Sequence, residues 1–467
     1  MTLVIRLPDK HIAERLYICK VIFEEFLGVE YRTEFYDSIN TEITMQDDSL
    51  NKTLYIEDAF LSIPDSEWLN EGSMPIIPLK VWDLSVTPLQ NFVVMSKLPV
   101  IYGADPSNPD FFRVNKNHIK LGLDILGSAF FMLTRYEELL KPDRDEHGRF
   151  PASASLAYQE GFLDRPIINE YLEILWWCLK YLWPRLERKK RLFRVSLSHD
   201  VDSPYAYAFQ PLYKNLIACG GDIVKRKSIS LATSRFLNWL IVKNGNIEKD
   251  PNNTFNYIMD ISEKYNIKSI FNFQVLNSSQ YDANYSLDHP YMQYLLKLIS
   301  NRGHEIGLHP GYNTIRDSEE TKAAFLHLKS ACDKLGIKQD QWGGRQHYLR
   351  WQAPYTWQNY EDAGFDYDNT LSYADHAGFR CGICYDYSVF NLLTRSELKL
   401  KERPLVVMEC SILENKYMGF DYSEAFDYIA GLINNCSLYN GVFSLLWHNN
   451  RLKDEMDLSL YGNIVKY

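Results

Sequence analysis

Histidines and carboxylates follow directly after several apolar, strand-like segments in the second half of the chain. In the clearest case, residues 193–198 alternate between apolar and polar side chains, and the cluster His199-Asp200-Val201-Asp202 follows. An alternation with a period of two indicates a β-strand. Charged groups at the end of a strand are typical of α/β enzymes, which present catalytic residues there. For this segment alone, a solvated acidic turn is the alternative interpretation.

Later segments end in the same way. A predicted strand over 304–309 ends at His309, a strand over 341–350 carries Arg345 and His347, a segment over 367–371 carries Asp368, and His448 follows a strand over 441–446. Because the carboxyl ends of parallel strands meet at one edge of a sheet or barrel, we expect these side chains to gather there. One such histidine is usually a packed or surface residue, but this repeated pattern favours a functional site.

The elements that must position these residues alternate between strand and helix. Helices are predicted over 254–265, 290–300, 317–336, 355–363 and 423–434, and further strands over 269–273 and 404–408. A mostly helical insertion, about 205–250, follows the first strand. The alternation predicts an α/β fold with a parallel sheet or a β/α barrel.

The first part of the chain shows no such strand ends. Helices are predicted over 9–27, 123–140 and 167–187, and short strands over 53–56, 92–95 and 98–102. The polar loop 141–149 contains carboxylates, but its proline and glycine favour a solvated turn. We predict an α+β accessory domain over residues 1–190 and a second domain over 191–467, with the basic run 185–191 as a solvated linker.

Composition and charge limit the class of protein. The chain has 467 residues, which suggests two or more domains, and a formal net charge of −10, which argues against nonspecific nucleic-acid binding. Its eight cysteines are scattered and predict no disulfide framework. Cys381 and Cys384 form a lone Cys-x-x-Cys pair, which is two ligands short of a structural zinc site.

No targeting or membrane-spanning segment is predicted. The N-terminus has no basic region followed by a long apolar core, so it is not a secretory signal. No uninterrupted apolar run reaches the roughly 20 residues that cross a bilayer. The most apolar stretch, 167–183, contains four charged or amide side chains and predicts a buried amphipathic helix. These features predict a soluble protein in the reducing cytoplasm.

From about Arg194 to the C-terminus, the chain resembles the polysaccharide deacetylase superfamily, of the carbohydrate esterase family 4 type, in the order and spacing of its motifs. The cluster at 199–202 resembles the family's first motif, in which one aspartate is the general base and the next binds the metal, here with the Asp-x-Asp spacing of a variant branch. The segment 303–309 (GHEIGLH) resembles the strand whose last histidine is a metal ligand.

Three further positions resemble the family with differences. The family has a second histidine four residues after the first, and this chain has Asn313 there. Arg345 resembles the residue that orients the catalytic aspartate, with His347 in place of the usual proline after it. His448 follows Leu446-Trp447, as the general acid does in the family's last motif. Residues 131–138 resemble an uncharacterised domain that precedes such deacetylases in bacteria, which implies no activity.

The resemblance implies an irregular (β/α) barrel of the polysaccharide deacetylase type behind an α+β accessory domain. It also implies metal-assisted hydrolysis of an N-acetyl group on an amino sugar or glycan precursor of the bacterial surface. Asp202 and His309 would bind a divalent ion, expected to be zinc, with Asn313 or His347 completing the protein ligands. Asp200 would be the general base, kept ionised by Arg345, and His448 the general acid.

Two other interpretations stay open. The chain could be a non-catalytic carbohydrate-binding relative, because the amide oxygen of Asn313 is a weaker metal ligand than imidazole. It could also be a hydrolase of another linear amide on the same fold. The presence of both Asp200 and His448 favours an enzyme, because a decayed site would not need both. Aromatic residues near Arg345 could stack on sugar rings, although core packing suits most of them better: Tyr348, Trp351, Tyr355 and Trp357.

Overall fold

The computed structural model describes residues 1–467 and divides the strands among three β-sheets. The first part of the chain builds a six-stranded sheet in the order β2-β1-β3-β4-β8-β7 and a two-stranded sheet, β5-β6. The strands are β1 (Leu3–Pro8), β2 (Tyr31–Tyr36), β3 (Asn40–Met45), β4 (Thr53–Glu57), β5 (Lys80–Asp83), β6 (Lys97–Val100), β7 (Phe112–Val114) and β8 (His118–Leu121).

The helices of this part confirm most of the sequence-based expectations. They are α1 (Ile12–Cys19), which continues as a π-helical segment over Lys20–Phe26, α2 (Ile125–Leu133), α3 (Tyr136–Leu140), α4 (Leu156–Gln159) and α5 (Ile167–Leu182). The predicted helix 123–140 is divided because Arg135 adopts a left-handed φ of 55°. None of the helices is long and apolar enough to span a bilayer.

The predicted strand over 92–95 is wrong. Residues 90–92 form a 3₁₀ turn, and side chains satisfy the backbone of this segment in place of a neighbouring strand. Tyr439 donates its hydroxyl to the carbonyl of Phe92 at 3.2 Å, and Arg165 donates to the carbonyl of Met95 at 3.4 Å. A short apolar run therefore gave a strand-like pattern without a pairing partner.

The second part of the chain builds a nine-stranded sheet in the order β14-β15-β13-β12-β11-β10-β9-β17-β16. The strands are β9 (Arg194–Val201), β10 (Ile270–Phe273), β11 (Glu305–Leu308), β12 (Gly343–Gly344), β13 (Tyr367–Asp368), β14 (Tyr387–Asn391), β15 (Ser396–Glu402), β16 (Val407–Met408) and β17 (Val442–Leu446). All neighbours are parallel except β14 and β15, which are antiparallel.

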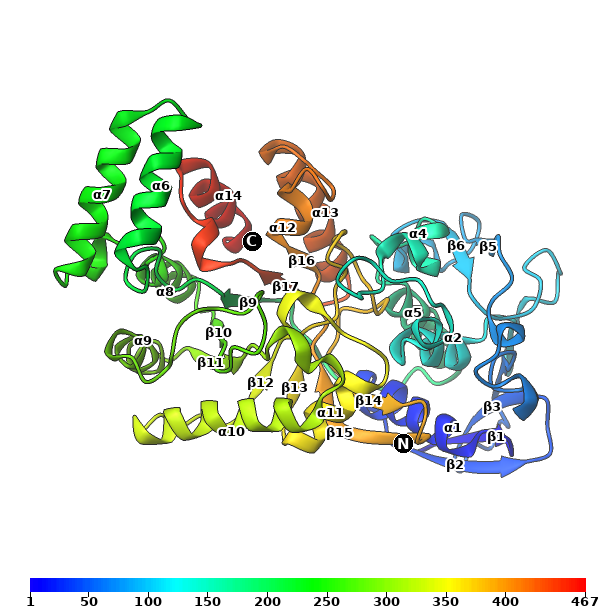
Figure 1. Ribbon diagram of the computed structural model, residues 1–467. Helices are drawn as coiled ribbons and strands as arrows, with labels where there is room; N and C mark the ends of the chain where they lie inside the picture. Colours follow the sequence, from blue (N-terminus) through cyan, green and yellow to red (C-terminus); the bar gives the residue numbers. More distant parts are fainter.

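The helices that alternate with these strands surround the sheet (Figure 1). They are α6 (Leu212–Val224), α7 (Ile229–Lys243), α8 (Phe255–Lys264), α9 (Pro290–Asn301), α10 (Ser318–Lys334), α11 (Tyr355–Ala363), α12 (Glu409–Leu413), α13 (Tyr422–Leu438) and α14 (Glu455–Val465). The long strand predicted over 341–350 is reduced to two residues. The chain turns away after β12, where Tyr348 and Leu349 have left-handed φ values of 62° and 53°.

The mixed α/β class is confirmed, and the sheet curls toward itself. The backbone N–H groups of Arg403 and Leu405 donate to the carbonyls of Asp368 and Leu371 at 2.8 and 3.2 Å. The next residue, Val406, donates to the carbonyl of Ser444 on β17 at 3.2 Å. One segment thus connects the chain after β13 with β17. The strand ladder itself runs from β14 to β16, and its closure into an irregular (β/α) barrel stays a prediction.

The two parts of the chain share one core. A single hydrophobic cluster of 116 buried residues contains side chains from both, from Leu3 to Val465. Residues 185, 187, 189 and 190 of the basic run are exposed, as in the predicted solvated linker, but the end of the run packs against both parts of the chain. Its Arg191 lies 4.2 Å over the ring of Tyr385 and donates to the carbonyl of Glu25 at 2.6 Å. The division at residue 190 stays a prediction, with each large sheet on one side of it.

A buried ionic cluster joins the parts. Glu138, in the middle of the first part's α3, accepts from Arg135 at 2.8 Å and from Arg380 at 2.5 and 2.9 Å. All three side chains are almost fully buried. Burial raises the pKa of Glu138, but the two guanidinium groups lower it by more, so the carboxyl stays ionised.

We expect Glu138→Ala to lower the free energy of unfolding by about 3–5 kcal/mol, because it leaves two buried guanidinium groups without their shared partner. Denaturant titration measures this loss. Glu187→Ala removes an exposed carboxylate that makes no ion pair, and should change the same quantity by less than about 0.5 kcal/mol. Equal effects of the two substitutions would contradict the role of the cluster.

The stabilisation by Glu138 should also depend on pH. Because its folded-state pKa lies below the ordinary value of 4.5, its contribution is complete above that pH and is lost as the pH falls through the folded-state value. The difference in unfolding free energy between wild type and Glu138→Ala should therefore stay constant from neutral pH to about pH 5 and shrink in more acidic solution. A difference that grows on acidification would contradict this assignment.

Candidate active site

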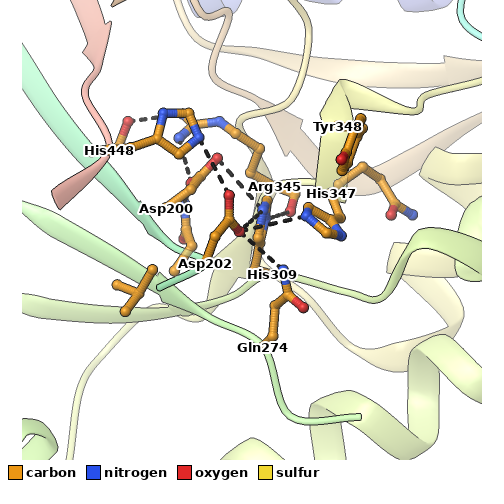
Figure 2. Close-up of polar contacts among 12 residues, drawn as sticks. Asp200, Asp202, Gln274, His309, Arg345, His347, Tyr348 and His448 are labelled. Atoms are coloured by element: carbon orange, nitrogen blue, oxygen red, sulfur yellow. Dashed lines mark hydrogen bonds and ion pairs between the residues drawn. The ribbon is translucent and has the colours of Figure 1, made fainter. Parts of the chain in front are cut away.

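The candidate residues lie at the carboxyl ends of neighbouring parallel strands. Asp200 is on β9 and Asp202 follows it, His309 follows β11, Arg345 and His347 follow β12, and His448 follows β17. Figure 2 shows these side chains converging on one place. The shared strand direction explains why segments almost 250 residues apart in sequence meet there.

Three of these residues form a group that suits a metal ion. The possible ligand atoms of Asp202, His309 and His347 all lie within 4.8 Å of one another. Asp202 Oδ1 is 3.3 Å from His309 Nε2 and 3.5 Å from His347 Nε2. One carboxylate and two imidazoles are a donor set of catalytic zinc sites with three protein ligands.

The second ring nitrogen of each histidine is already bonded. His309 Nδ1 lies 2.6 Å from the carbonyl oxygen of Arg345, and His347 Nδ1 lies 3.1 Å from Asp282 Oδ1. Metal-binding histidines usually donate their other N–H to a carbonyl or carboxylate in this way, which fixes the ring. Both Nε2 atoms are therefore directed toward Asp202, and the three residues fit a divalent ion.

Asp282 is a residue that the sequence analysis missed. Its carboxylate accepts from the backbone N–H groups of Tyr312 at 2.7 Å and Ser279 at 2.8 Å, in addition to its contact with His347. Burial raises the pKa of Asp282, but His347 and these N–H groups lower it to about 2. Asp282 lies in an irregular loop after β10, where no strand pattern could have indicated it.

The structure does not bring Asn313 to this group. Asn313 is exposed in the 3₁₀ turn Tyr312–Arg316, and its amide donates to the carbonyl of Ser278 at 3.4 Å. The turn begins directly after Gly311, so the side chain four residues after His309 is directed away from Asp202. His347 stands in the group instead.

One carboxylate oxygen of Asp200 accepts two hydrogen bonds, and the other accepts none. Its Oδ1 accepts from Asn272 Nδ2 at 2.8 Å and from Arg345 Nη1 at 3.0 Å. Its Oδ2 lies 3.8 Å from His309 Nε2. Burial raises the pKa of Asp200, but Arg345 and the nearby histidines lower it by more, so the carboxylate is ionised.

Arg345 is itself held in place. Its Nη2 donates to Ser198 Oγ at 2.8 Å, and its Nε donates to the carbonyl of Asn369 at 2.9 Å. Only 1% of the residue is exposed. These three directions of hydrogen bonding fix the guanidinium plane against Asp200.

His448 lies on the other side of Asp202 and pairs with Glu409, a second residue that the sequence analysis did not assign. His448 Nδ1 is 2.6 Å from Glu409 Oε1, and its Nε2 is 3.7 Å from Asp202 Oδ2. Burial lowers the pKa of His448, but Glu409 raises it by more, to well above the ordinary value. Glu409 directly follows β16, so the rule that identified the other residues could have found it.

These side chains line a cavity of about 470 Å³, a volume within the range of small-molecule sites. Asp200, Asp202, His309, His347 and His448 lie in its wall, together with Tyr348 and Arg149. Tyr348 is 36% exposed, which leaves its ring accessible to a ligand, whereas Trp351 and Trp357 are core residues. Cys381 and Cys384 are buried free thiols.

The first part of the chain reaches this cavity through the end of loop 141–149. Residues 142, 143 and 146 are exposed, as in the predicted solvated turn, but the last residue is buried. Arg149 is only 6% exposed. It donates to the carbonyl of Tyr348 at 3.0 Å and to the hydroxyl of Tyr417 at 3.3 Å. Arg350, from the second part of the chain, donates to the carbonyl of His147 in the loop at 2.6 Å. The loop thus holds the left-handed turn that directly follows His347.

Comparison with known proteins gives a family match for the first part of the chain. A family of unknown function (DUF7033) matches residues 3–184. No curated protein matches the chain.

Three solved structures match about 60% of the chain at low similarity. A putative polysaccharide deacetylase from Mycobacterium smegmatis has 13% identity and a TM-score of 0.38, over 60% of this chain and 84% of that one. Puue allantoinase has 14% identity and a TM-score of 0.35, over 61% and 85%. A probable polysaccharide deacetylase from Pseudomonas aeruginosa PAO1 has 12% identity and a TM-score of 0.34, over 59% and 85%. These values are too low to assign a function to the chain.

Proposed function

We propose that this protein is a metal-dependent hydrolase that removes N-acetyl groups from an amino sugar or glycan precursor in bacterial surface polysaccharide metabolism. The observation that carries the proposal is the group Asp202, His309 and His347, with Asp200 and His448 on either side in one cavity. The substrate class follows from the resemblance of the sequence motifs to those of polysaccharide deacetylases. The cytoplasmic setting stays a prediction.

Asp202, His309 and His347 would hold a divalent ion, and their donor set suits zinc. A bound ion would polarise the acetyl carbonyl and lower the pKa of water in the site. Of the two residues that the sequence offers for the third ligand, Asn313 and His347, His347 would complete the set. Asp282 and the carbonyl of Arg345 orient the two imidazoles.

Asp200 is suited to act as the general base. Its Oδ2 makes no hydrogen bond, while Arg345 and Asn272 hold Oδ1 and so fix the direction of the carboxylate. This oxygen accepts the proton of the attacking water as the hydroxyl group bonds to the acetyl carbon. Arg345 keeps Asp200 ionised before the reaction, because the buried guanidinium offsets the cost of burying the carboxylate.

His448 is suited to act as the general acid. Glu409 stabilises its charged form and bonds to Nδ1, so the proton on Nε2 faces the cavity. That proton passes to the amine nitrogen as the carbon–nitrogen bond breaks, and the products are acetic acid and the free amine, which exchange a proton in solution to give acetate and an ammonium group. The proton on Asp200 later restores His448, so the balance over one turnover is one water molecule consumed.

We also propose that residues 1–190 form an accessory domain that completes the cavity. Arg149 contributes to the cavity wall and holds the backbone of Tyr348, one residue after the proposed ligand His347. Two successive left-handed residues, Tyr348 and Leu349, cost of order 1–3 kcal/mol each and need such support.

Metal affinity tests the ligand set. We expect His309→Ala and His347→Ala each to weaken zinc binding at least about 100-fold, because each removes one of three protein ligands. Competition with a chromophoric chelator measures the affinity. Asn313→Ala is the matched control and should bind zinc as tightly as wild type does. Loss of affinity in Asn313→Ala with none in His347→Ala would exchange the two assignments.

Acetate release tests the acid–base pair. With zinc bound, Asp200→Asn and His448→Gln should each lower kcat about 10²–10⁴-fold on an N-acetylated amino sugar or oligosaccharide, with Asn313→Ala as the control. If the wild-type protein does not bind zinc and releases no acetate from a broad panel of N-acetylated sugars, it is a non-catalytic relative. Cleavage of a different linear amide, with no acetate from the sugars, would support the second hydrolase alternative.

A further inference from the structure

Helices α6 and α7 form a hairpin that projects from the body of the molecule (Figure 1). The hairpin segment, residues 205–250, leaves the sheet shortly after Asp202. Its base is fixed by Asp250, whose carboxylate accepts from the backbone N–H groups of Ala206 at 2.7 Å and Tyr207 at 2.8 Å. Nearby, Asn252 donates to the carbonyl of Ser203 at 3.2 Å. The hairpin therefore starts and ends at the strand edge that carries the cavity.

The outer side of α6 is apolar and exposed. Its six large apolar residues are between 47% and 76% exposed: Leu212, Tyr213, Leu216, Ile217, Ile223 and Val224. The other five lie one, four, five, eleven and twelve positions after Leu212. In a helix with 3.6 residues per turn, all six therefore lie on one face. We call these six residues the apolar stripe.

The buried side of α6 is polar. Asp222 is fully buried, accepts from Arg235 of α7 at 2.5 Å and pairs with Arg226. Asn215 is also fully buried and donates to Gln210 at 3.3 Å. A surface helix normally buries its apolar face and exposes its polar one. Here satisfied polar contacts fix the reverse orientation, so the apolar stripe is a stable surface feature.

The hairpin is also basic in an acidic protein. Residues 205–250 contain seven lysines and arginines against three carboxylates, a net charge of +4, whereas the whole chain carries −10. The sequence Lys225-Arg226-Lys227 forms the tip, between the exposed Val224 and the 72% exposed Ile229. Five exposed lysines of the hairpin form no ion pair: Lys214, Lys225, Lys227, Lys243 and Lys249.

We propose that this hairpin docks the protein on a membrane surface that contains anionic lipids. The apolar stripe and Ile229 enter the boundary between headgroups and acyl chains, and the lysines at the tip contact lipid phosphates. An exposed apolar helix face flanked by lysines has the chemistry of interfacial helices. Each basic residue near an anionic leaflet adds about 1 kcal/mol of attraction, which corresponds to roughly fivefold in affinity.

Charge also distinguishes a lipid surface from a second copy of this chain. A twofold dimer through the apolar stripe would bring two hairpins of charge +4 together, and an isologous contact cannot avoid this repulsion. An anionic bilayer instead complements the hairpin. Docking does not depend on the proposed reaction.

Co-sedimentation with lipid vesicles tests the proposal on the full chain. We expect wild type to bind vesicles of phosphatidylcholine with phosphatidylglycerol at least about tenfold more tightly than vesicles of phosphatidylcholine alone, with weaker binding at high salt. Ile217→Ser/Val224→Ser and Lys225→Glu/Lys227→Glu should each reduce binding about tenfold or more. Circular dichroism should show an unchanged helix content in each variant.

Matched controls are an exposed leucine and two exposed lysines on or just after α10. Leu326→Ser and Lys334→Glu/Lys338→Glu make the same kinds of change away from the hairpin and should bind vesicles as wild type does. Failure of wild type to bind anionic vesicles would overturn the proposal, as would equal binding by the hairpin variants. Self-association that Ile217→Ser/Val224→Ser abolishes, without vesicle binding, would identify the stripe as a contact between two copies.

Discussion

The arrangement of the cavity depends on one carboxylate, that of Asp202. Three imidazoles from three different strand ends approach it, with His309, His347 and His448 at 3.3 to 3.7 Å. Burial raises the pKa of Asp202, but these histidines lower it by more, so the carboxylate remains charged at the centre of the group. Gln274 at the end of β10 adds a hydrogen bond at 3.0 Å. A neutral residue in this place would leave the three rings without a common partner, and the strand ends would lose the charge around which they converge.

Each ring that faces Asp202 is oriented by another group bonded to its Nδ1. The carbonyl of Arg345 holds His309, Asp282 holds His347, and Glu409 holds His448. His309 and His347 direct toward Asp202 the Nε2 atoms that could hold an ion, whereas Glu409 raises the pKa of His448 and so favours its protonated form. The first part of the chain supports the region around His347, because Arg149 holds the turn that follows it and the ionic cluster around Glu138 joins the two parts.

The sequence allowed most of the second sheet to be predicted, because period-two strands and capped helices alternate there. It also indicated Asp200, Asp202, His309, Arg345 and His448, since each follows a strand-like segment. Other features depend on contacts that no local pattern encodes. The segment 341–350 looks like a strand, but the strand ends at Gly344 and Tyr348 and Leu349 are left-handed, so His347 faces Asp202 from an irregular turn. Asp282 lies in an irregular loop, and Arg149 looked like part of a solvated turn until its partners on Tyr348 and Tyr417 were known. The resemblance to deacetylases directed attention to Asn313, which a 3₁₀ turn directs outward.

Anomalous diffraction at the zinc absorption edge, from crystals of the full chain grown with zinc, tests the central claim most directly. The account predicts one dominant peak in contact with Asp202 Oδ1 and with the Nε2 atoms of His309 and His347, and away from Asn313. A cavity without a peak, or a peak held instead by the neighbouring group of Glu409, Cys410 and His448, would contradict it.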